Sequence, residues 1–525
     1  MSILSVILAV SPVVVIFVLL AILKRTADVA GLLGWVFTVA LAILYFRTSP
    51  RVCLVASAAG VVESLPITLM VVASLFQMTL MLETGAVARL VATVKGIAAG
   101  DRVAQILIVN VGLGTLLTAL GATPVSILPP IMIALGYSSF VAIALPAIGY
   151  DALCTYALLG IPVVVFGSFT GLDPNQAGTY FAKFMPVIST AIAFGMLYLA
   201  GKWRLMWQGL VPTLLAGLTA GFTAMLMNRL GMTTLTGVVA GAFVIGVMAL
   251  YTVLRGRKIY ERAAGTDADA AARTKMGLAA AISPWIILTV AAFFTNTPVL
   301  PVFKFLFKTL EMPVTLIPDA PNKVRFFWQA YFWVTVSTFL ALPFLKPTKE
   351  QFATAVKKWA RRSWRPAIAS AVFFAIAFVI NQSGRFPIPG GAWVPPADVA
   401  GANMVSVLAH AAAGAFGGFY GAVVPFLGLL GGFISGSETS AIAMLTKLHL
   451  ETADVEGKLK TVGLLWAAAS GIGGGLASVI SPAKLQNAAA IIDAIGEEGK
   501  VLRKTVVLSL VITAIAAVMT VLFTL

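Results

Sequence analysis

Glycines, hydroxyls and one carboxyl gather in the stretch PFLGLLGGFISGSETS, residues 425–440. Glu438 is the only acidic residue between Asp398 and Glu451, and apolar sequence flanks it on both sides. The pattern predicts a helix broken at membrane depth, where polar backbone is tolerated if protein buries it or a watery cavity meets it. An acid at such a place marks a candidate functional site. The alternative is a short loop at the membrane surface, with its hydroxyls acting as ordinary helix N-caps.

Two further stretches carry similar interruptions. TALGATPVS, residues 118–126, combines hydroxyls with glycine and proline, so we expect a helix break near residues 121–124. Near the C-terminus, WAAASGIGGGLASVISPAKLQNAAAII places Ser481, Lys484 and Asn487 after a glycine run. Interrupted segments in both halves of a membrane protein indicate a transporter site at the interface of two repeats. Identity between the halves is poor, so an inverted repeat is suggested without being demonstrated.

A helix broken at membrane depth exposes N–H groups at the start of its second half, and these bind anions. Hydroxyls near the breaks add donors, and a small hydroxylated carboxylate suits such a site. The candidate substrate-binding residues are Thr123, Ser126, Ser435, Gly436, Ser437, Thr439, Ser440, Ser481 and Asn487.

Four titratable residues in the apolar stretches are candidates for moving protons or charge. Glu438 is the strongest, because burial disfavours the charged form of a carboxyl and lets it hold a proton. Asp151 and His410 are the other proton-coupling candidates, and Lys484 is a further charged candidate. Each has a structural alternative: a turn at the membrane surface for Asp151, a packing role for His410, and snorkelling to the interface for Lys484.

Composition identifies the fold class. Of 525 residues, 60% are hydrophobic and 11% are charged, and the mean hydropathy is +0.99. Repeated apolar runs of about 20 residues predict an all-α polytopic membrane protein. We expect roughly 12–14 transmembrane segments, with broken helices and re-entrant hairpins. We treat residues 1–525 as one transporter domain, comprising a first-half core (51–200), middle helices with basic loops (201–398) and a second-half core (399–525).

The net charge of +16 is concentrated in a few loops, so it indicates topology rather than nucleic-acid binding. Residues 255–275 and 346–365 are basic and are predicted to face the cytoplasm, and counting the expected spans back from the basic loop at Lys202 places the N-terminus outside. The segment 346–365 is either an amphipathic helix on the inner leaflet or a plain cytosolic loop. Glu63 to Pro66 interrupt an apolar run, which predicts a hairpin or a kinked helix there.

The sequence contains none of the common catalytic motifs that we looked for. The two histidines lie on different segments, and the HExxH, GxSxG and phosphate-loop patterns are absent. Cys53 and Cys154 form no disulfide or zinc pattern. We therefore expect no enzyme activity, no cofactor and no metal.

The sequence resembles the bacterial lactate permease family in several motifs. VPFLGLLGGFISGSETS, followed by SGIGGGLASVISPAKLQ, resembles the C-terminal half of that family, and Gly160-Ile161-Pro162 with Thr170-Gly171-Leu172-Asp173 resembles an N-terminal stretch. The family's lysine before Ile-Ser-Pro is replaced here by Ser478, and Lys484 follows six residues later. Leu117 and Thr118 stand where that family usually has a glutamate and a glycine-rich run.

The resemblance implies proton-coupled import of lactate, glycolate or a similar 2-hydroxy acid across the bacterial inner membrane. The expected partners are the organic anion, protons and membrane lipids, with no nucleic acid; homo-oligomer formation stays open. Two alternatives remain: a passive channel, or a transporter for another small organic anion such as a sulfonate or a dicarboxylate.

Overall fold

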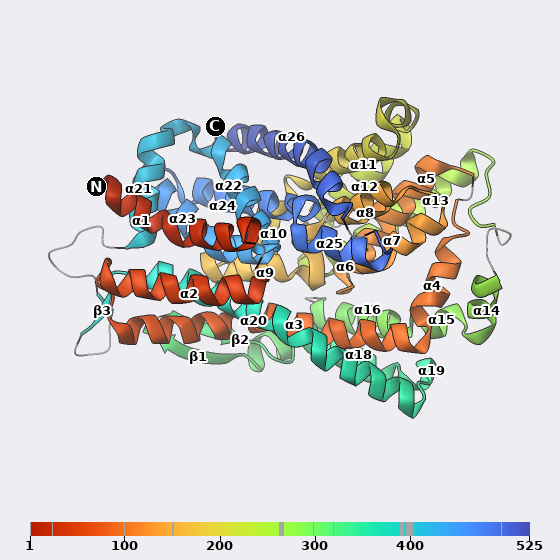
Figure 1. The fold of residues 1–525 in the computed structure, drawn as a ribbon, viewed down its shortest axis with the longest axis horizontal. Coiled ribbons are helices and arrows are strands. Elements are labelled where there is room, and N and C mark those ends of the chain that lie inside the picture. Colours follow the sequence, from red (N-terminus) through yellow and green to blue (C-terminus); the bar gives the residue numbers. More distant parts are fainter. Residues whose placement is uncertain are drawn as a thin grey trace.

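Helices make up nearly all of the structure, a computed structural model (Figure 1). It describes the whole chain except residues 1, 24, 99, 123, 150–151, 262–266, 298, 319, 389–392, 395–402 and 495; the side chains of residues 20, 21, 126, 320–323, 434, 482, 483 and 490 are also excluded. Within the described part, ten helices are long and apolar enough to span a membrane, or up to twelve if each of two bent pairs counts as one span. The all-α polytopic fold is therefore confirmed, with a number of candidate spans in the described part that reaches at most the lower limit of the predicted 12–14.

The first half of the chain is a series of helices interrupted at several points. They are α1 (Ile3–Phe17), α2 (Ala27–Leu44), α3 (Pro50–Thr84), α4 (Ala86–Val94), α5 (Arg102–Ile106), α6 (Gly114–Ala119), α7 (Pro124–Ala134), α8 (Ser139–Gly149), α9 (Ala157–Thr170), α10 (Pro174–Ala182), α11 (Met185–Gln208), α12 (Leu210–Arg229) and α13 (Thr236–Leu254). Segments with π-helical hydrogen bonding cover Val18–Ile22 and Leu107–Leu113, and 3-10 turns cover Cys154–Tyr156 and Thr233–Leu235.

The second half continues in the same style. Its helices are α14 (Asp267–Lys275), α15 (Leu278–Ala281), α16 (Ser283–Asn296), α17 (Pro301–Lys304), α18 (Ala330–Leu340), α19 (Leu342–Leu345), α20 (Lys349–Gln382), α21 (Met404–Phe416), α22 (Tyr420–Ser435), α23 (Glu438–Val455), α24 (Lys460–Leu476), α25 (Pro482–Ile491) and α26 (Glu498–Thr524). A π-helical segment covers Phe305–Thr309, and 3-10 turns cover Gly417–Phe419 and Ser478–Ile480.

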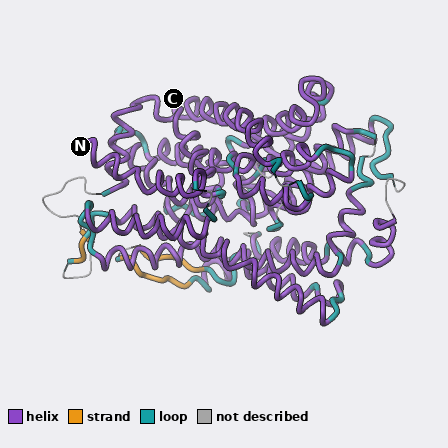
Figure 2. The backbone as a smooth tube through the Cα atoms, in the orientation of Figure 1, coloured by secondary structure: helices purple, strands orange, loops and turns teal. Residues whose placement is uncertain are grey.

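The strands in the described part of the chain form two short antiparallel hairpins, which the all-helical prediction did not include. They pair β1 (Met312–Ile317) with β2 (Ala320–Val324), and β3 (Phe386–Pro387) with β4 (Trp393–Val394). Figure 2 shows both at the periphery of the helical body, so neither forms part of its core.

Helix α3 passes through the interruption at Glu63 to Pro66 without turning back. It is continuous over 35 residues, so the hairpin interpretation of this stretch is wrong. Proline removes one backbone donor, and hydroxyls nearby take part in the local hydrogen bonding. Ser64 Oγ donates to the carbonyl of Val61 at 2.7 Å and lies 3.1 Å from Thr68 Oγ1.

Most of the basic segment 346–365 forms the first part of α20. This helix is 34 residues long, and its later part is apolar enough to span a membrane. It packs against the C-terminal half of α3: Trp359 Nε1 donates to the carbonyl of Val72 at 2.9 Å, and Lys358 Nζ lies 2.6 Å from Glu83 Oε1. The plain-loop interpretation is therefore wrong; the segment is helical, as the other interpretation expected, and is continuous with a candidate span. Farther along the pair, Gly60 approaches the backbone of Phe374, so the two helices run antiparallel.

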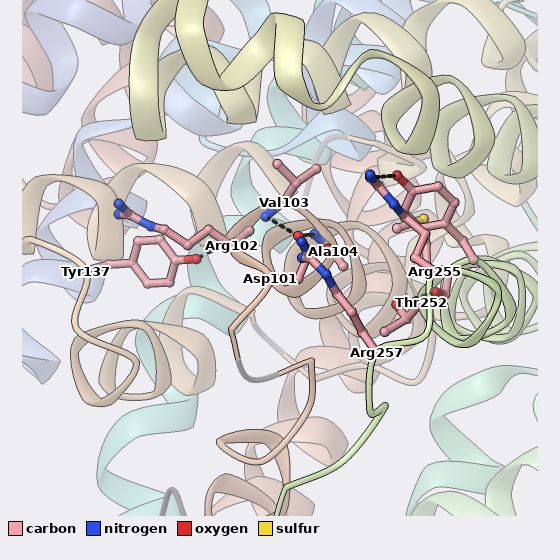
Figure 3. Close-up of polar contacts among 10 residues, drawn as sticks. Asp101, Arg102, Val103, Ala104, Tyr137, Thr252, Arg255 and Arg257 are labelled. Atoms are coloured by element: carbon pink, nitrogen blue, oxygen red, sulfur yellow. Dashed lines mark hydrogen bonds and ion pairs between the residues drawn. The ribbon is translucent and has the colours of Figure 1, made fainter.

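A cluster of polar residues links the start of α5 to the segments that follow α7 and α13 (Figure 3). Asp101 accepts backbone hydrogen bonds of 3.1 Å from Val103 and Ala104, and so caps α5. Its other carboxylate oxygen lies 2.6 Å from the guanidinium of Arg257, and the hydroxyl of Tyr137 donates to the carbonyl of Arg102. Because these groups satisfy one another, we assign the cluster a structural role.

Candidate functional site

The predicted break in residues 425–440 is present and lies between α22 and α23. Gly436 ends α22 with φ +69°, a left-handed conformation that glycine adopts readily. Ser437 is the N-cap of α23, and its Oγ accepts from the backbone N–H of Ser440 at 3.4 Å. Ser435 Oγ donates to the carbonyls of Gly431 and Ser437 at 2.8 and 3.0 Å.

Glu438, in the first turn of α23, is buried, with 4% of its surface exposed. Ser437 thus acts as a helix N-cap, as the alternative interpretation expected, but protein encloses the carboxyl that follows it. Thr155 Oγ1 donates a hydrogen bond of 2.6 Å to Glu438 Oε1. The other oxygen, Oε2, receives no hydrogen bond from the side chains or backbone that the structure describes.

Thr155 reaches this carboxyl because the chain is unwound between α8 and α9. It lies in a 3-10 turn, and within the first turn of α9 Leu158, Leu159 and Gly160 all have φ between +55° and +79°. Such conformations are unfavourable for leucine and are retained where surrounding contacts enforce them, which is common at functional sites. Tyr156 anchors the segment: its hydroxyl donates to the carbonyl of Gly178 at 3.1 Å and accepts from Asn228 Nδ2 at 3.0 Å.

Gly475, near the end of α24, forms the wall beside the free oxygen of Glu438. A Cβ placed on Gly475 would lie 2.8 Å from Glu438 Oε2 and 3.4 Å from the Cβ of Cys154. Earlier in α24, Gly473 approaches the backbone of α22 so closely that a Cβ there would overlap the carbonyl of Pro425. The glycine run therefore brings α22 and α24 into backbone contact and leaves room for the carboxyl.

The N-terminus of a second helix, α25, lies next to the break. A Cβ on Gly436 would be 3.4 Å from Ser481 Oγ, and Ser481 is the N-cap residue of α25. Ser481 is buried, and its hydroxyl has no hydrogen-bond partner within the described structure. Two helix N-termini, those of α23 and α25, thus meet at one place, and N-termini attract anions.

Lys484, in the first turn of α25, directs its charge toward the same place. Its Nζ donates to Ser478 Oγ at 2.7 Å, and Ser478 Oγ donates to the carbonyl of Gly475 at 2.9 Å. The ammonium also acts electrostatically on the Glu438 carboxyl. Ser478 stands where the lactate permease pattern described above has a lysine. The ammonium of Lys484, six residues later, lies next to the Ser478 side chain and so places a positive charge close to that position.

The remaining predicted residues are distributed more widely. Thr439 and Ser440 are buried beside Glu438, whereas Asn487 lies on an exposed part of α25. His410 is exposed on α21, where its Nδ1 lies 2.9 Å from the carbonyl of Ser406. Thr123, Asp151 and the side chain of Ser126 lie outside the described residues.

The other predicted break, near residues 121–124, is also present. Helix α6 ends at Ala119, Gly121 has φ +87°, and α7 begins at Pro124. Helix α25 packs against α7 and α8, so interrupted segments from both halves of the chain meet in the core.

Thr155 and Gly475 were not among the sequence candidates, although both face Glu438. Gly475 lies in the glycine run noted above, whereas Thr155 belongs to no motif, and each meets the carboxyl only through folding. The available signal for Thr155 is that Pro146, Gly149, Gly160 and Pro162 interrupt the apolar sequence on both sides of it.

This architecture, with apolar spans, broken helices and neighbouring helix N-termini beside a buried carboxyl, defines a polytopic membrane protein of the transporter class. The family model described as L-lactate permease matches residues 5–525. The chain therefore belongs to the L-lactate permease family.

Individual relatives agree with this assignment at low identity. The chain is 25% identical to a glycolate permease of Escherichia coli (strain K12), over 99% of this chain and 95% of the relative. It is 24% identical to an L-lactate permease of Streptococcus iniae, over 85% and 90% of the two chains, and 24% identical to an L-lactate permease of Escherichia coli (strain K12), over 98% and 95%. The protein is thus a divergent member of the family.

Proposed function

We propose that this protein imports a small 2-hydroxy monocarboxylate, such as lactate or glycolate, together with protons across the bacterial inner membrane. The substrate class is proposed from its relatives, which include an L-lactate permease and a glycolate permease. The single observation that carries proton coupling is the buried Glu438, bonded on one oxygen only, at the meeting point of two helix N-termini.

The substrate carboxylate binds at the N-termini of α23 and α25, where backbone dipoles, Ser437 and the free hydroxyl of Ser481 supply donors. Lys484 contributes positive charge to the same site. The substrate hydroxyl pairs with one of the neighbouring serine or threonine hydroxyls. Thr123, Ser126, Ser435, Gly436, Thr439, Ser440 and Asn487 remain candidates for lining the path.

Glu438 links this binding to protons. When the carboxyl is protonated, it no longer repels an incoming carboxylate and offers it a donor. When it loses the proton on the cytoplasmic side, the restored negative charge favours release of the anion. By thermodynamic linkage, proton and anion then strengthen each other's binding. Asp151 and His410 are secondary candidates for the proton route.

Counterflow in proteoliposomes tests the substrate class. Vesicles loaded with unlabelled L-lactate should accumulate labelled L-lactate transiently, and glycolate should compete. If dicarboxylates or sulfonates compete and 2-hydroxy monocarboxylates do not, the protein transports another class of substrate. Flux without counterflow would instead indicate a passive channel.

A further inference from the structure

A long groove lies on the outside of the helical body between α11 and α26, which are in contact near the top of Figure 1. Its volume is about 1050 Å³. Most of the lining is apolar, with Val187, Ala191 and Phe194 from α11 and Val511 and Ile515 from α26. The groove is far larger than a cavity for one small carboxylate and does not include the Glu438 site.

One end of this groove is basic. Lys202, Arg503 and Lys504 line it, and all three are exposed, while none of the lining residues is acidic. Lys504 Nζ also lies 4.8 Å from the centroid of the Phe140 ring. The basic end therefore presents three cations to whatever occupies the groove.

Two acids precede these cations on the chain, and both are engaged elsewhere. Glu497 Oε2 accepts from Ser139 Oγ at 2.6 Å, and Glu498 Oε2 accepts from the backbone N–H of Gly496 at 2.6 Å. Neither carboxylate forms an ion pair with the groove cations among the described residues. The positive charge of the groove end is thus available to an external anion.

Aromatic side chains mark the depth of this end in the membrane. Tyr198 and Trp203 form an edge-to-face pair with ring centroids 5.4 Å apart, and both are exposed. Exposed tyrosine and tryptophan are enriched at the membrane–water interface. From Arg503 to Ile515, α26 rises about 18 Å at 1.5 Å per residue, close to the roughly 15 Å of one hydrocarbon leaflet.

We propose that this groove binds an anionic phospholipid, with its phosphate on Lys202, Arg503 and Lys504 and an acyl chain along α11 and α26. Shape and charge both favour this occupant: an apolar trough of leaflet length that ends in three cations and aromatic residues. Anionic lipids are concentrated in the cytoplasmic leaflet, the side on which basic segments of this chain are expected.

Native mass spectrometry of the full-length protein with phosphatidylglycerol or phosphatidylcholine tests the site. The variant K202Q/R503Q/K504Q should lose phosphatidylglycerol affinity by roughly fivefold for each charge removed, with phosphatidylcholine binding unchanged. K357Q/R361Q/R362Q is the matched control, because it removes the same charge from an exposed face of α20. Equal losses in both triple variants, or no loss in the first, would overturn the proposal.

A second variant tests the acyl chain and does not depend on charge. Ala191→Trp fills the apolar part of the groove and should weaken phosphatidylglycerol binding at least fivefold while leaving the cations in place. Undiminished binding by A191W would overturn the lipid site. If the groove is instead covered by a second copy of the chain, both variants should change the mass from dimer to monomer without affecting lipid binding, and the proposal fails.

Discussion

Thr155 and Glu438 are separated by 283 positions in the chain and are joined by a hydrogen bond of 2.6 Å in the buried core. The bond connects the unwound segment before α9 to the first turn of α23 after the break. It therefore fixes the carboxyl relative to two helix interruptions from opposite halves of the protein.

Replacing Thr155 should impair transport according to the loss of its hydroxyl. Thr155→Val removes the donor to Glu438 Oε1, a loss of about 1.5–3 kcal/mol for a hydrogen bond to a charged group. Thr155→Ser keeps the donor. We expect labelled lactate uptake in proteoliposomes to fall strongly in T155V and to stay near the parent level in T155S. Equal uptake by T155V and the parent would remove Thr155 from the site.

Gly475→Ala should disturb the carboxyl from its other side. The added Cβ would lie 2.8 Å from Glu438 Oε2, so Glu438 or α24 has to shift, at about 1–3 kcal/mol for an overpacked position. Uptake should fall clearly. Gly414→Ala on α21, where no atom lies within 4 Å of the new Cβ, is the control and should transport normally. Normal transport by G475A would contradict the close contact.

The crossing of α22 and α24 should be sensitive to a single methyl group. A Cβ on Gly428 would overlap the carbonyl of Ser470, so Gly428→Ala should lower the melting temperature of the purified protein, reflecting about 1–3 kcal/mol. Gly246→Ala on α13 meets no atom within 4 Å and serves as the matched helix control. Equal melting temperatures for the two variants would show that α22 and α24 can move apart at no cost in stability, and would contradict the prediction.

The orientation of the protein follows from its basic segments. We expect the start of α20 in the cytoplasm, because it is rich in lysine and arginine. Since α20 runs antiparallel to α3, Arg47, before the start of α3, then faces outward. A cysteine at Arg47 should react with an impermeant thiol reagent in intact cells, and one at Lys357 should be protected. The reverse labelling pattern would invert the topology.

Local features of the sequence were sufficient for part of this structure. The breaks near residues 121–124 and 435–437 were predictable because glycine, proline and hydroxyls interrupt apolar runs there. Pro66 was misleading: α3 continues through it, since the neighbouring helices hold the chain in place. The basic start of α20 was misread because its partner on α3, including Val72 and Glu83, is distant in sequence.

The details of the site were less accessible from the sequence. Glu438 could be singled out as a lone acid in an apolar stretch, but its contacts with Thr155 and Gly475 depend on how three distant segments pack. The approach of Ser481 to Gly436 likewise brings together two helix starts whose proximity no local pattern encodes. Periodicity and residue type identify interruptions, and tertiary packing decides which of them meet.

Transport by Glu438→Gln in proteoliposomes tests the central claim most directly. Glutamine resembles the protonated carboxyl in shape and charge but cannot release a proton. We predict that lactate exchange persists in E438Q, while uphill accumulation driven by an inward proton gradient is lost. Retained accumulation in E438Q would contradict the account, because the carboxyl would then only hold the backbone of the break in place.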